Sequence, residues 1–247
     1  MSKITFGLVG KEISYSFSRG YFAEKFKKLS LDNHQYVNFD LPEISPLGAI
    51  IQAKEQGLKG LNVTIPYKQE VQQFLTALDK DAEEIGAVNT IKLNADGTVV
   101  GYNTDVYGFQ KSIEPLLASH HTKALILGTG GASKAVAYAF KKLGIAYKFV
   151  SRTAKNDGFS YEDLNEEILK SYKVIVNCSP VGTSPDVHLK PDIPYEYLSK
   201  NHLLYDLIYN PSETAFLKFG KQKGAAIKNG YQMLELQAEK SWEIWNL

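Results

Sequence analysis

A glycine-rich turn that joins an apolar segment to an amphipathic one limits the folds open to this chain. Ala124–Leu127 is a short apolar run typical of a buried strand, and the turn GTGGA follows it at Gly128–Ala132. Apolar residues then recur at helical spacing as far as Leu143, where Gly144 can end a helix. A buried strand, a tight turn and a helix in this order predict a doubly wound, parallel α/β sheet.

The same alternation of strand and helix runs along the rest of the chain. An Asp-Gly pair within Asn94–Gly97 also predicts a hairpin between Ala87–Leu93 and Thr98–Tyr102. By apolar pattern the remaining strands are expected at Ile4–Val9, Tyr36–Phe39, Leu61–Ile65, Tyr147–Val150, Val174–Val176 and Leu203–Leu207. By helical spacing the remaining helices are expected at Tyr21–Leu29, Leu47–Gln56 and Met233–Trp245.

These elements predict an α/β protein of two domains. The first is a mixed α/β substrate-binding and catalytic domain with an antiparallel edge, and the second is a doubly wound, Rossmann-like dinucleotide-binding domain. The C-terminal helix carries Trp242 and Trp245 on one stripe, which we expect to pack on the first domain because aromatic side chains dominate core burial. The expected boundaries are therefore 1–104 with 231–247, and 105–230.

Charge and cysteine content narrow the classes of function. Lys and Arg number 28 against 27 Asp and Glu, so no charge excess favours nucleic acid or an anionic membrane, and a small-molecule substrate is expected. Cys178 is the single cysteine, which excludes an intramolecular disulfide, and its surroundings favour a small buried residue over a nucleophile. No apolar run or N-terminal segment is typical of a membrane span or a secretory signal. We expect a cytoplasmic monomer or homodimer.

The glycine turn is suited to a dinucleotide. Gly128 allows a tight turn, Gly130 lets the backbone approach a pyrophosphate, and the helix N-terminus supplies N–H donors. A plain tight turn is the alternative. A nucleoside-triphosphate loop is excluded because Lys followed by Ser or Thr would be needed, whereas Ser133 precedes Lys134.

The end of the next strand predicts which dinucleotide binds. An acidic residue there would accept hydrogen bonds from the ribose diol of NAD, but the chain has Ser151, Arg152 and Thr153. Arginine suits a ribose 2′-phosphate, and Lys155 adds charge nearby, so NADP is favoured. The alternative is that Arg152 is a solvated surface residue.

A polar set lies upstream of the glycine turn. GLNVTIPYK at Gly60–Lys68, with Asn103, Thr104 and Asp105, offers an amine, a carboxylate and neutral donors. No pair among the five histidines has the spacing of metal ligands, so no metal is expected.

Nine motifs in order along the chain resemble the shikimate dehydrogenase family. They lie at Ser16–Ser18, Asn62–Lys68, Gly86–Thr90, Gly101–Gly108, Gly128–Ala132, Ser151–Thr153, Asn177–Gly182, Asp206–Thr214 and Gly230–Gln237. The resemblance implies NADPH-dependent, reversible reduction of the 3-ketone of 3-dehydroshikimate to shikimate, a step toward aromatic amino acids. The cofactor residues that it implies are Gly128, Thr129, Gly130, Gly131, Ala132, Ser151, Arg152, Thr153, Lys155, Leu207 and Gly230.

The resemblance also implies the residues that hold the substrate. Ser16, Ser18 and Tyr209 would bind its carboxylate through hydroxyl donors. Ser18 could instead, or in addition, cap the helix that follows. Ring hydroxyls would be bound by Thr64, Asn89, Asp105 and Gln237, although Thr64 and Asn89 could be turn residues and Gln237 a packing residue.

Lys68, with Asp105, is the candidate for proton transfer. Hydride addition to a ketone leaves an alkoxide, which needs a positioned acid with a proton available near neutral pH. The alternative is that Lys68 is an N-terminal helix lysine after Pro66.

The chain departs from the family motifs at a few positions, which leaves two alternatives open. Arg19 stands where the family commonly has Pro, and Ser151 replaces the usual Asn, so substrate specificity is less well defined than reaction class. One alternative is a quinate/shikimate dehydrogenase or a paralogue with another carboxylated polyol or NAD. The other is a non-catalytic NADP-binding sensor, against which the presence of both Lys68 and Asp105 argues.

Overall fold

The structure is a computed structural model that describes residues 3–14, 16–52, 57–154 and 157–247. The chain divides into two compact units: unit one is Met1–Thr104 with Ala238–Leu247, and unit two is Asp105–Gln237. The division falls inside two helices, α4 (Thr104–Ile113) and α8 (Tyr231–Asn246). None of the helices in the described residues combines the length and the apolar character that a membrane-spanning helix needs.

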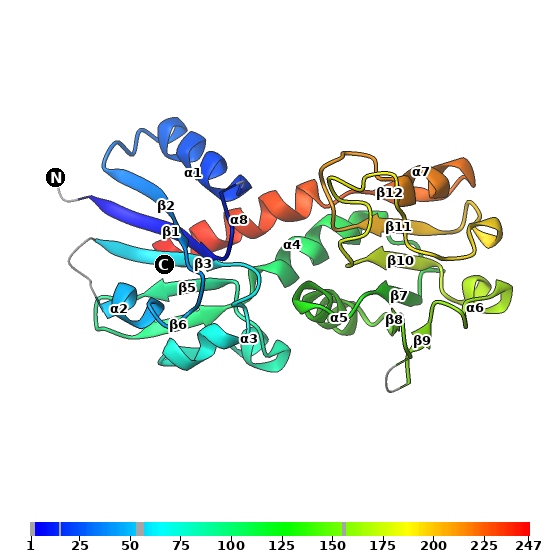
Figure 1. The fold of residues 1–247 in the computed structure, drawn as a ribbon, viewed down its shortest axis with the longest axis horizontal. Coiled ribbons are helices and arrows are strands. Elements are labelled where there is room, and N and C mark those ends of the chain that lie inside the picture. Colours follow the sequence, from blue (N-terminus) through cyan, green and yellow to red (C-terminus); the bar gives the residue numbers. More distant parts are fainter. Residues whose placement is uncertain (1–2, 15, 53–56, 155–156) are drawn as a thin grey trace. The chain divides into compact units, whose positions relative to one another are not determined.

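Unit one is built on a mixed sheet whose described strands follow the order β2-β1-β3-β5-β6-β4 (Figure 1). β1 pairs in parallel with β2 and β3, whereas β5 is antiparallel to β3 and β6. The expected hairpin is thus confirmed, but the antiparallel strand β5 lies inside the sheet, because the edge strand β4 pairs in parallel with β6. The strands are β1 Ile4–Gly10, β2 His34–Asp40, β3 Leu58–Val63, β4 Ala77–Leu78, β5 Thr90–Leu93 and β6 Val99–Tyr102.

Helices cover both faces of this sheet, with α1 on one side and α2 and α3 on the other (Figure 1). Successive β1 side chains point to opposite faces, so Phe6 and Leu8 pack with α1 and α8 whereas Val9 packs with α2. The helices of unit one are α1 Phe17–Lys28, α2 Leu47–Gln52, the 3₁₀ helix η2 Glu70–Phe74 and α3 Lys80–Ile85.

The C-terminal helix α8 packs on the sheet of unit one, as expected. The Trp245 indole donates to the Ile91 carbonyl oxygen at 2.9 Å and stacks on Phe6 with ring centroids 4.7 Å apart. Ser241 Oγ lies 2.8 Å from Thr90 Oγ1, so the buried side of this helix contributes a polar contact as well as apolar ones.

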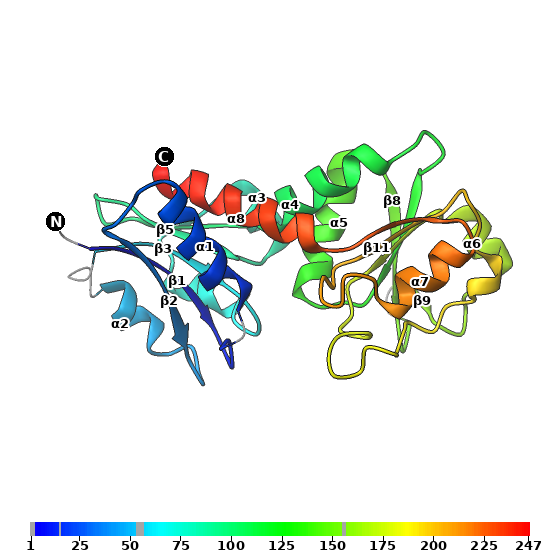
Figure 2. The ribbon, with the colours of Figure 1, turned by 90° about the horizontal axis from the view of Figure 1, so that it is seen from above.

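Unit two is built on a parallel sheet whose described strands follow the order β12-β11-β10-β7-β8-β9 (Figure 1). Figure 2 shows α5 and α7 on opposite sides of this sheet. This is the doubly wound order, and it reverses between β7 and β10, where such sheets bind ligands at their carboxyl ends. The strands are β7 Lys123–Leu127, β8 Ala146–Ser151, β9 Phe159–Ser160, β10 Val174–Asn177, β11 Leu203–Asp206 and β12 Ala226–Lys228.

Aromatic and aliphatic side chains join the helices of unit two to its sheet. Phe109 of α4 meets Phe140 of α5 and Tyr205 of β11 edge to face, with centroids 5.4 and 5.0 Å apart. Leu169 of α6 and Phe216 of α7 belong to a second cluster against the same sheet. The remaining helices are α5 Gly131–Leu143, α6 Glu166–Ser171, α7 Ala215–Gln222 and the 3₁₀ helices η3 Glu114–Leu116 and η4 Tyr195–Tyr197.

Several elements differ from the sequence-based expectation at their ends. α1 begins at Phe17, earlier than expected, because Ser16 caps it. β3 ends at Val63, where the chain turns before Pro66. The expected helix Leu47–Gln56 is observed to Gln52, and its last four residues lie outside the described residues. The short helices α3, α6 and α7 were not expected, because six to eight residues give too few turns for a clear apolar period.

Candidate functional site

The turn after β7 has the geometry that the glycines predicted. Gly128 has φ +101°, a conformation that favours glycine, and its N–H donates to the Val150 carbonyl oxygen at 2.8 Å. Gly130 is the N-cap of α5, and no described side chain bonds to the first N–H groups of the helix as a cap. With no acidic residue in its first turn, the positive end of the α5 dipole is open to an anion such as a pyrophosphate.

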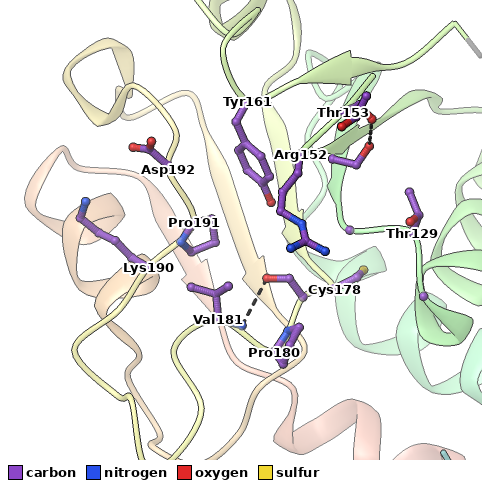
Figure 3. Close-up of a pocket in the computed structure, with 14 residues that line it drawn as sticks. Thr129, Arg152, Thr153, Tyr161, Cys178, Pro180, Val181, Lys190, Pro191 and Asp192 are labelled. Atoms are coloured by element: carbon purple, nitrogen blue, oxygen red, sulfur yellow. Dashed lines mark hydrogen bonds between the residues drawn. The ribbon is translucent and has the colours of Figure 1, made fainter. Parts of the chain in front are cut away.

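A pocket of about 900 Å³ joins this turn to the end of β8 and to the loop after β10 (Figure 3). This size and the switch-point position suit a cofactor. Of the expected cofactor residues, Gly131 and Ala132 form the first turn of α5 outside the pocket lining, and Lys155 lies outside the described residues. The lining residues are Gly128, Thr129, Gly130, Ser151, Arg152, Thr153, Tyr161, Cys178, Ser179, Pro180, Val181, Lys190, Pro191 and Asp192.

The end of β8 presents a cation and hydroxyls to this pocket. Arg152 is exposed there, and the Ser151 hydroxyl donates to the Thr153 carbonyl oxygen at 2.6 Å, which shapes the turn around the arginine. A carboxylate that could accept the ribose diol of NAD is missing from these three positions. The donors therefore fit a dinucleotide that carries a 2′-phosphate.

Asn177 holds the loop on the opposite side of the pocket. Its Oδ1 accepts from the Ser179 N–H at 3.0 Å and from the Ser179 hydroxyl at 2.6 Å, and its Nδ2 donates to Asp206 Oδ1 at 3.0 Å. Asp206 also accepts from the Thr214 hydroxyl at 2.6 Å and the Ile208 N–H at 3.1 Å. This network joins the loops that follow β10 and β11.

Burial raises the pKa of Asp206 to about 6, against hydrogen bonds that lower it. The folded state therefore holds the carboxyl proton of Asp206 more tightly than the unfolded state does. Asp206 contributes most to the free energy of unfolding below pH 4, and this contribution is lost as pH rises toward 6. Two pH units correspond to about 3 kcal/mol. We expect the unfolding free energy of Asp206→Asn, measured in urea, to lack this decline. Parallel pH profiles for wild type and variant would contradict the assignment.

Leu207 and Gly230, both expected to contact the cofactor, lie close together in the structure. Gly230 N–H donates to the carbonyl oxygen of Ile208, the residue after Leu207, at 3.2 Å. Tyr209, the expected carboxylate donor, follows in this loop and is half-buried. Neither Leu207 nor Gly230 lines the described pocket.

The loop that carries Lys68 in unit one is held at three points. Thr64 N–H donates to the Val9 carbonyl oxygen at 2.9 Å, and the Tyr67 hydroxyl donates to the Leu41 carbonyl oxygen at 2.6 Å. The Lys68 carbonyl oxygen accepts from Val88 N–H at 2.7 Å. Lys68 lies in a turn before η2, so the alternative that it is a lysine of the helix N-terminus is wrong. The side chain of Lys68 is half-buried and extends from a backbone that these hydrogen bonds hold in place.

The loop that carries Ser16 and Ser18 leads into α1, and the residue that caps this helix is not Ser18, the cap suggested by the sequence. The N-cap residue is Ser16, whose hydroxyl oxygen accepts from the Ser18 N–H at 3.2 Å. Ser18 therefore lies in the first turn and is not the cap. Its buried hydroxyl instead hydrogen-bonds to Tyr36, whose own pKa burial raises.

A buried polar chain crosses the sheet of unit one from this serine. The Tyr36 hydroxyl donates to Asn62 Oδ1 at 2.8 Å, and Asn62 Nδ2 donates to Ser241 Oγ at 3.0 Å. Ser241 contacts Thr90, which donates to Asn89 Oδ1 at 3.1 Å. The sequence signal for this network was the presence of polar residues, Asn62 and Thr90, within largely apolar strands.

Asn89 is bonded within the protein as well as being an expected substrate residue. Its Oδ1 accepts from the Thr104 N–H at 2.7 Å, and its Nδ2 donates to the Thr104 hydroxyl at 3.0 Å. Asn89 is 3% exposed, so these bonds fix its side chain. These hydrogen bonds are consistent with the alternative that Asn89 has a structural role. Its contact with a ligand stays a prediction.

Asp105 and Gln237, both expected to bind ring hydroxyls, lie on adjacent helices of unit two. A Cβ at Gly108 would lie 2.5 Å from the Met233 carbonyl oxygen and 3.1 Å from the Gln237 nitrogen, so α4 and α8 touch at this glycine. Asp105 is three residues earlier on α4, in its first turn, and is 8% exposed. The contact between α4 and α8 therefore lies about one helical turn from Asp105 along α4.

Cys178 lines the pocket, but burial raises the pKa of its thiol, which keeps the less reactive protonated form. Among the described residues no group of three or more His, Cys, Asp or Glu side chains could hold a metal ion.

Comparison with known proteins gives a consistent set of similarities. A family described as the shikimate dehydrogenase substrate binding domain matches residues 8–91. A shikimate dehydrogenase (NADP(+)) of Caldanaerobacter subterraneus is 37% identical, with 97% of this chain and 90% of that protein covered. A solved shikimate dehydrogenase in complex with NADP+ is 35% identical with a TM-score of 0.86, covering 98% of this chain and 90% of that one. A quinate dehydrogenase from Corynebacterium glutamicum in complex with NAD is 25% identical with a TM-score of 0.87, covering 99% and 94%.

Proposed function

Because the chain belongs to the shikimate dehydrogenase family, we propose that it catalyses the reversible, NADPH-dependent reduction of 3-dehydroshikimate to shikimate. Unit one, with α8, is proposed to bind the substrate, and unit two to bind the dinucleotide. The observation that carries the cofactor assignment is the pocket of unit two, which joins a glycine turn at a helix N-terminus to Arg152.

The residues of this pocket fit NADP. Gly128, Thr129 and Gly130 would hold the pyrophosphate through backbone N–H groups, and Arg152 with Thr153 would hold the 2′-phosphate. When bound, the nicotinamide supplies the hydride that reduces the ketone.

A polyol acid suits the polar side chains of unit one. Ser16 offers a hydroxyl donor for a carboxylate, and Ser18 would donate to it once its hydroxyl turns from Tyr36. Thr64 and Asn89 offer groups for ring hydroxyls. Asn103 strengthens this assignment: it is 7% exposed, and its Oδ1 has no hydrogen-bond partner among the described residues. Since a buried unpaired acceptor costs about 1–3 kcal/mol, a ligand hydroxyl bound there would offset that cost.

Lys68 is proposed to protonate the alkoxide oxygen formed at the reduced carbon, and to accept that proton in the oxidation direction. Its backbone is held by the Val88 N–H, so the proton donor starts from a fixed position. Asp105 and Gln237 are proposed to bind ring hydroxyls, and Tyr209 to assist with the carboxylate.

An assay of four substrate pairs tests the proposal. We expect reduced dinucleotide, followed by absorbance, to form fastest from shikimate with NADP, and more slowly from shikimate with NAD or from quinate with either dinucleotide. Binding of NADP without turnover of either acid would instead support the non-catalytic sensor. Turnover without NADP binding in the pocket of unit two would contradict the cofactor assignment.

The second candidate is a quinate/shikimate dehydrogenase, which the similarity to the NAD-bound quinate dehydrogenase favours. Faster turnover of quinate than of shikimate in the same assay would establish it. The proposed state is a monomer or homodimer in the cytoplasm, acting on small molecules and not on nucleic acid, consistent with the balanced charge of the chain.

A further inference from the structure

One polar side chain in the pocket of unit two belongs to none of the cofactor motifs. Tyr161 lines the pocket, and its hydroxyl end is directed toward the guanidinium of Arg152 (Figure 3). Its ring packs against the core cluster formed by α6, α7 and the sheet. The aromatic body is therefore anchored in protein, and the polar tip faces the pocket.

Strand register explains why these two side chains meet. β8 and β9 pair in parallel, with Val150 opposite Phe159 and Ser151 opposite Ser160. Arg152 and Tyr161 are the next residues on the two neighbouring chains, and adjacent strands are about 4.8 Å apart. The register brings them together although they are nine residues apart and separated by a loop.

The turn that follows β9 holds Tyr161 in place. Asp163 Oδ2 accepts from both the N–H and the hydroxyl of Ser160 at 2.7 Å, and Leu164 N–H donates to the Tyr161 carbonyl oxygen at 3.3 Å. These bonds bracket Tyr161, so little freedom is lost when its hydroxyl engages a ligand.

The phenol is a donor across the physiological pH range. Burial, with further contributions from Cys178 and Asp192, raises the pKa of Tyr161. A protonated hydroxyl beside a guanidinium can donate to an anion that the guanidinium also holds, and hydrogen bonds to charged acceptors are stronger than neutral ones.

The other charged lining residues are directed elsewhere. The Lys190 ammonium lies 4.5 Å from the ring centroid of Tyr195 and 4.8 Å from that of Phe219, and Figure 3 shows it pointing away from Arg152. Asp192 is exposed, and its carboxylate also points away from Arg152, so its repulsion of an anion is screened by solvent.

We propose that Tyr161 is a specificity-determining residue that donates a hydrogen bond to the ribose 2′-phosphate held by Arg152. This inference rests on the proposed use of NADP. Tyr161 adds to the affinity for NADP and contributes little to NAD, because the ribose hydroxyl of NAD carries no charge to strengthen the bond.

Calorimetric titration of NADP and NAD into Tyr161→Phe tests the inference. The substitution keeps the ring and removes the donor, so NADP is expected to bind about tenfold more weakly, with NAD binding unchanged within about twofold. Tyr172→Phe is the matched control, because Tyr172 packs against the same core and lies outside the pocket lining. It should leave both affinities as in wild type, and near-ultraviolet circular dichroism should show both variants folded.

Each outcome of the titration decides a separate point. If wild type prefers NADP and Tyr161→Phe binds it equally well, or loses both dinucleotides equally, the inference about Tyr161 is overturned while the proposed function stands. If wild type binds NAD as tightly as NADP, the proposed cofactor is overturned, and this inference with it.

Discussion

Lys68→Ala is expected to lower kcat for shikimate oxidation about a hundredfold to ten-thousandfold, with only a modest change in KM. This is the range by which a positioned acid or base accelerates proton transfer. The lysine loop is held through backbone atoms of Thr64 and Lys68 and through the Tyr67 hydroxyl, so the substitution removes the amine without releasing the loop. Steady-state kinetics with saturating NADP measures the effect.

The control for Lys68 is Lys59→Ala. Lys59 is exposed on β3, in the same unit, and its loss should leave kcat unchanged. Near-normal turnover of Lys68→Ala would contradict the assigned role. A large rise in KM with unchanged kcat would instead show that Lys68 only binds substrate.

Arg152→Gln is expected to weaken NADP binding about 10- to 100-fold and to leave NAD binding nearly unchanged. Charge-assisted, two-pronged hydrogen bonds to a phosphate are the strongest contacts available at this position, and Gln cannot reproduce them. Titration of both dinucleotides measures the change in preference.

The control for Arg152 is Lys170→Gln, which removes an exposed cation of α6 in the same unit and should change neither affinity. Equal losses for both dinucleotides in Arg152→Gln would indicate a general electrostatic role. Because Arg152 and Tyr161 are proposed to hold one phosphate, the effects of the double variant should not add.

The fold could be predicted well wherever local pattern and local chemistry agreed. The turn at Gly128 requires a glycine backbone conformation and a helix that starts just after it. Both are indicated by the few residues of the turn itself. The hairpin between β5 and β6 likewise follows from Asp96 and Gly97. The Trp242 and Trp245 stripe predicted that α8 would pack on unit one, because so much aromatic surface must be buried.

The candidate site could be predicted only in part. The motif residues were found by resemblance, and their roles toward a substrate stay predictions. The polar chain through Asn62, Thr90 and Ser241 was missed because its partners are up to 179 residues apart in sequence. The Ser16 cap was missed because Ser16 and Ser18 are equally good cap residues, and only the observed start of α1 distinguishes them.

The fold class, the family and the chemical character of the site could be predicted from contiguous residues, because apolar period, glycine position and motif order are local properties. Which side chains come together depends on the folded chain: Tyr161 lies beside Arg152 through strand register, α4 touches α8 at Gly108, and Asn177 meets Asp206 across neighbouring strands. Strand pairing and helix packing join residues of different elements, and the residue pattern within one element does not reveal which partner it will contact.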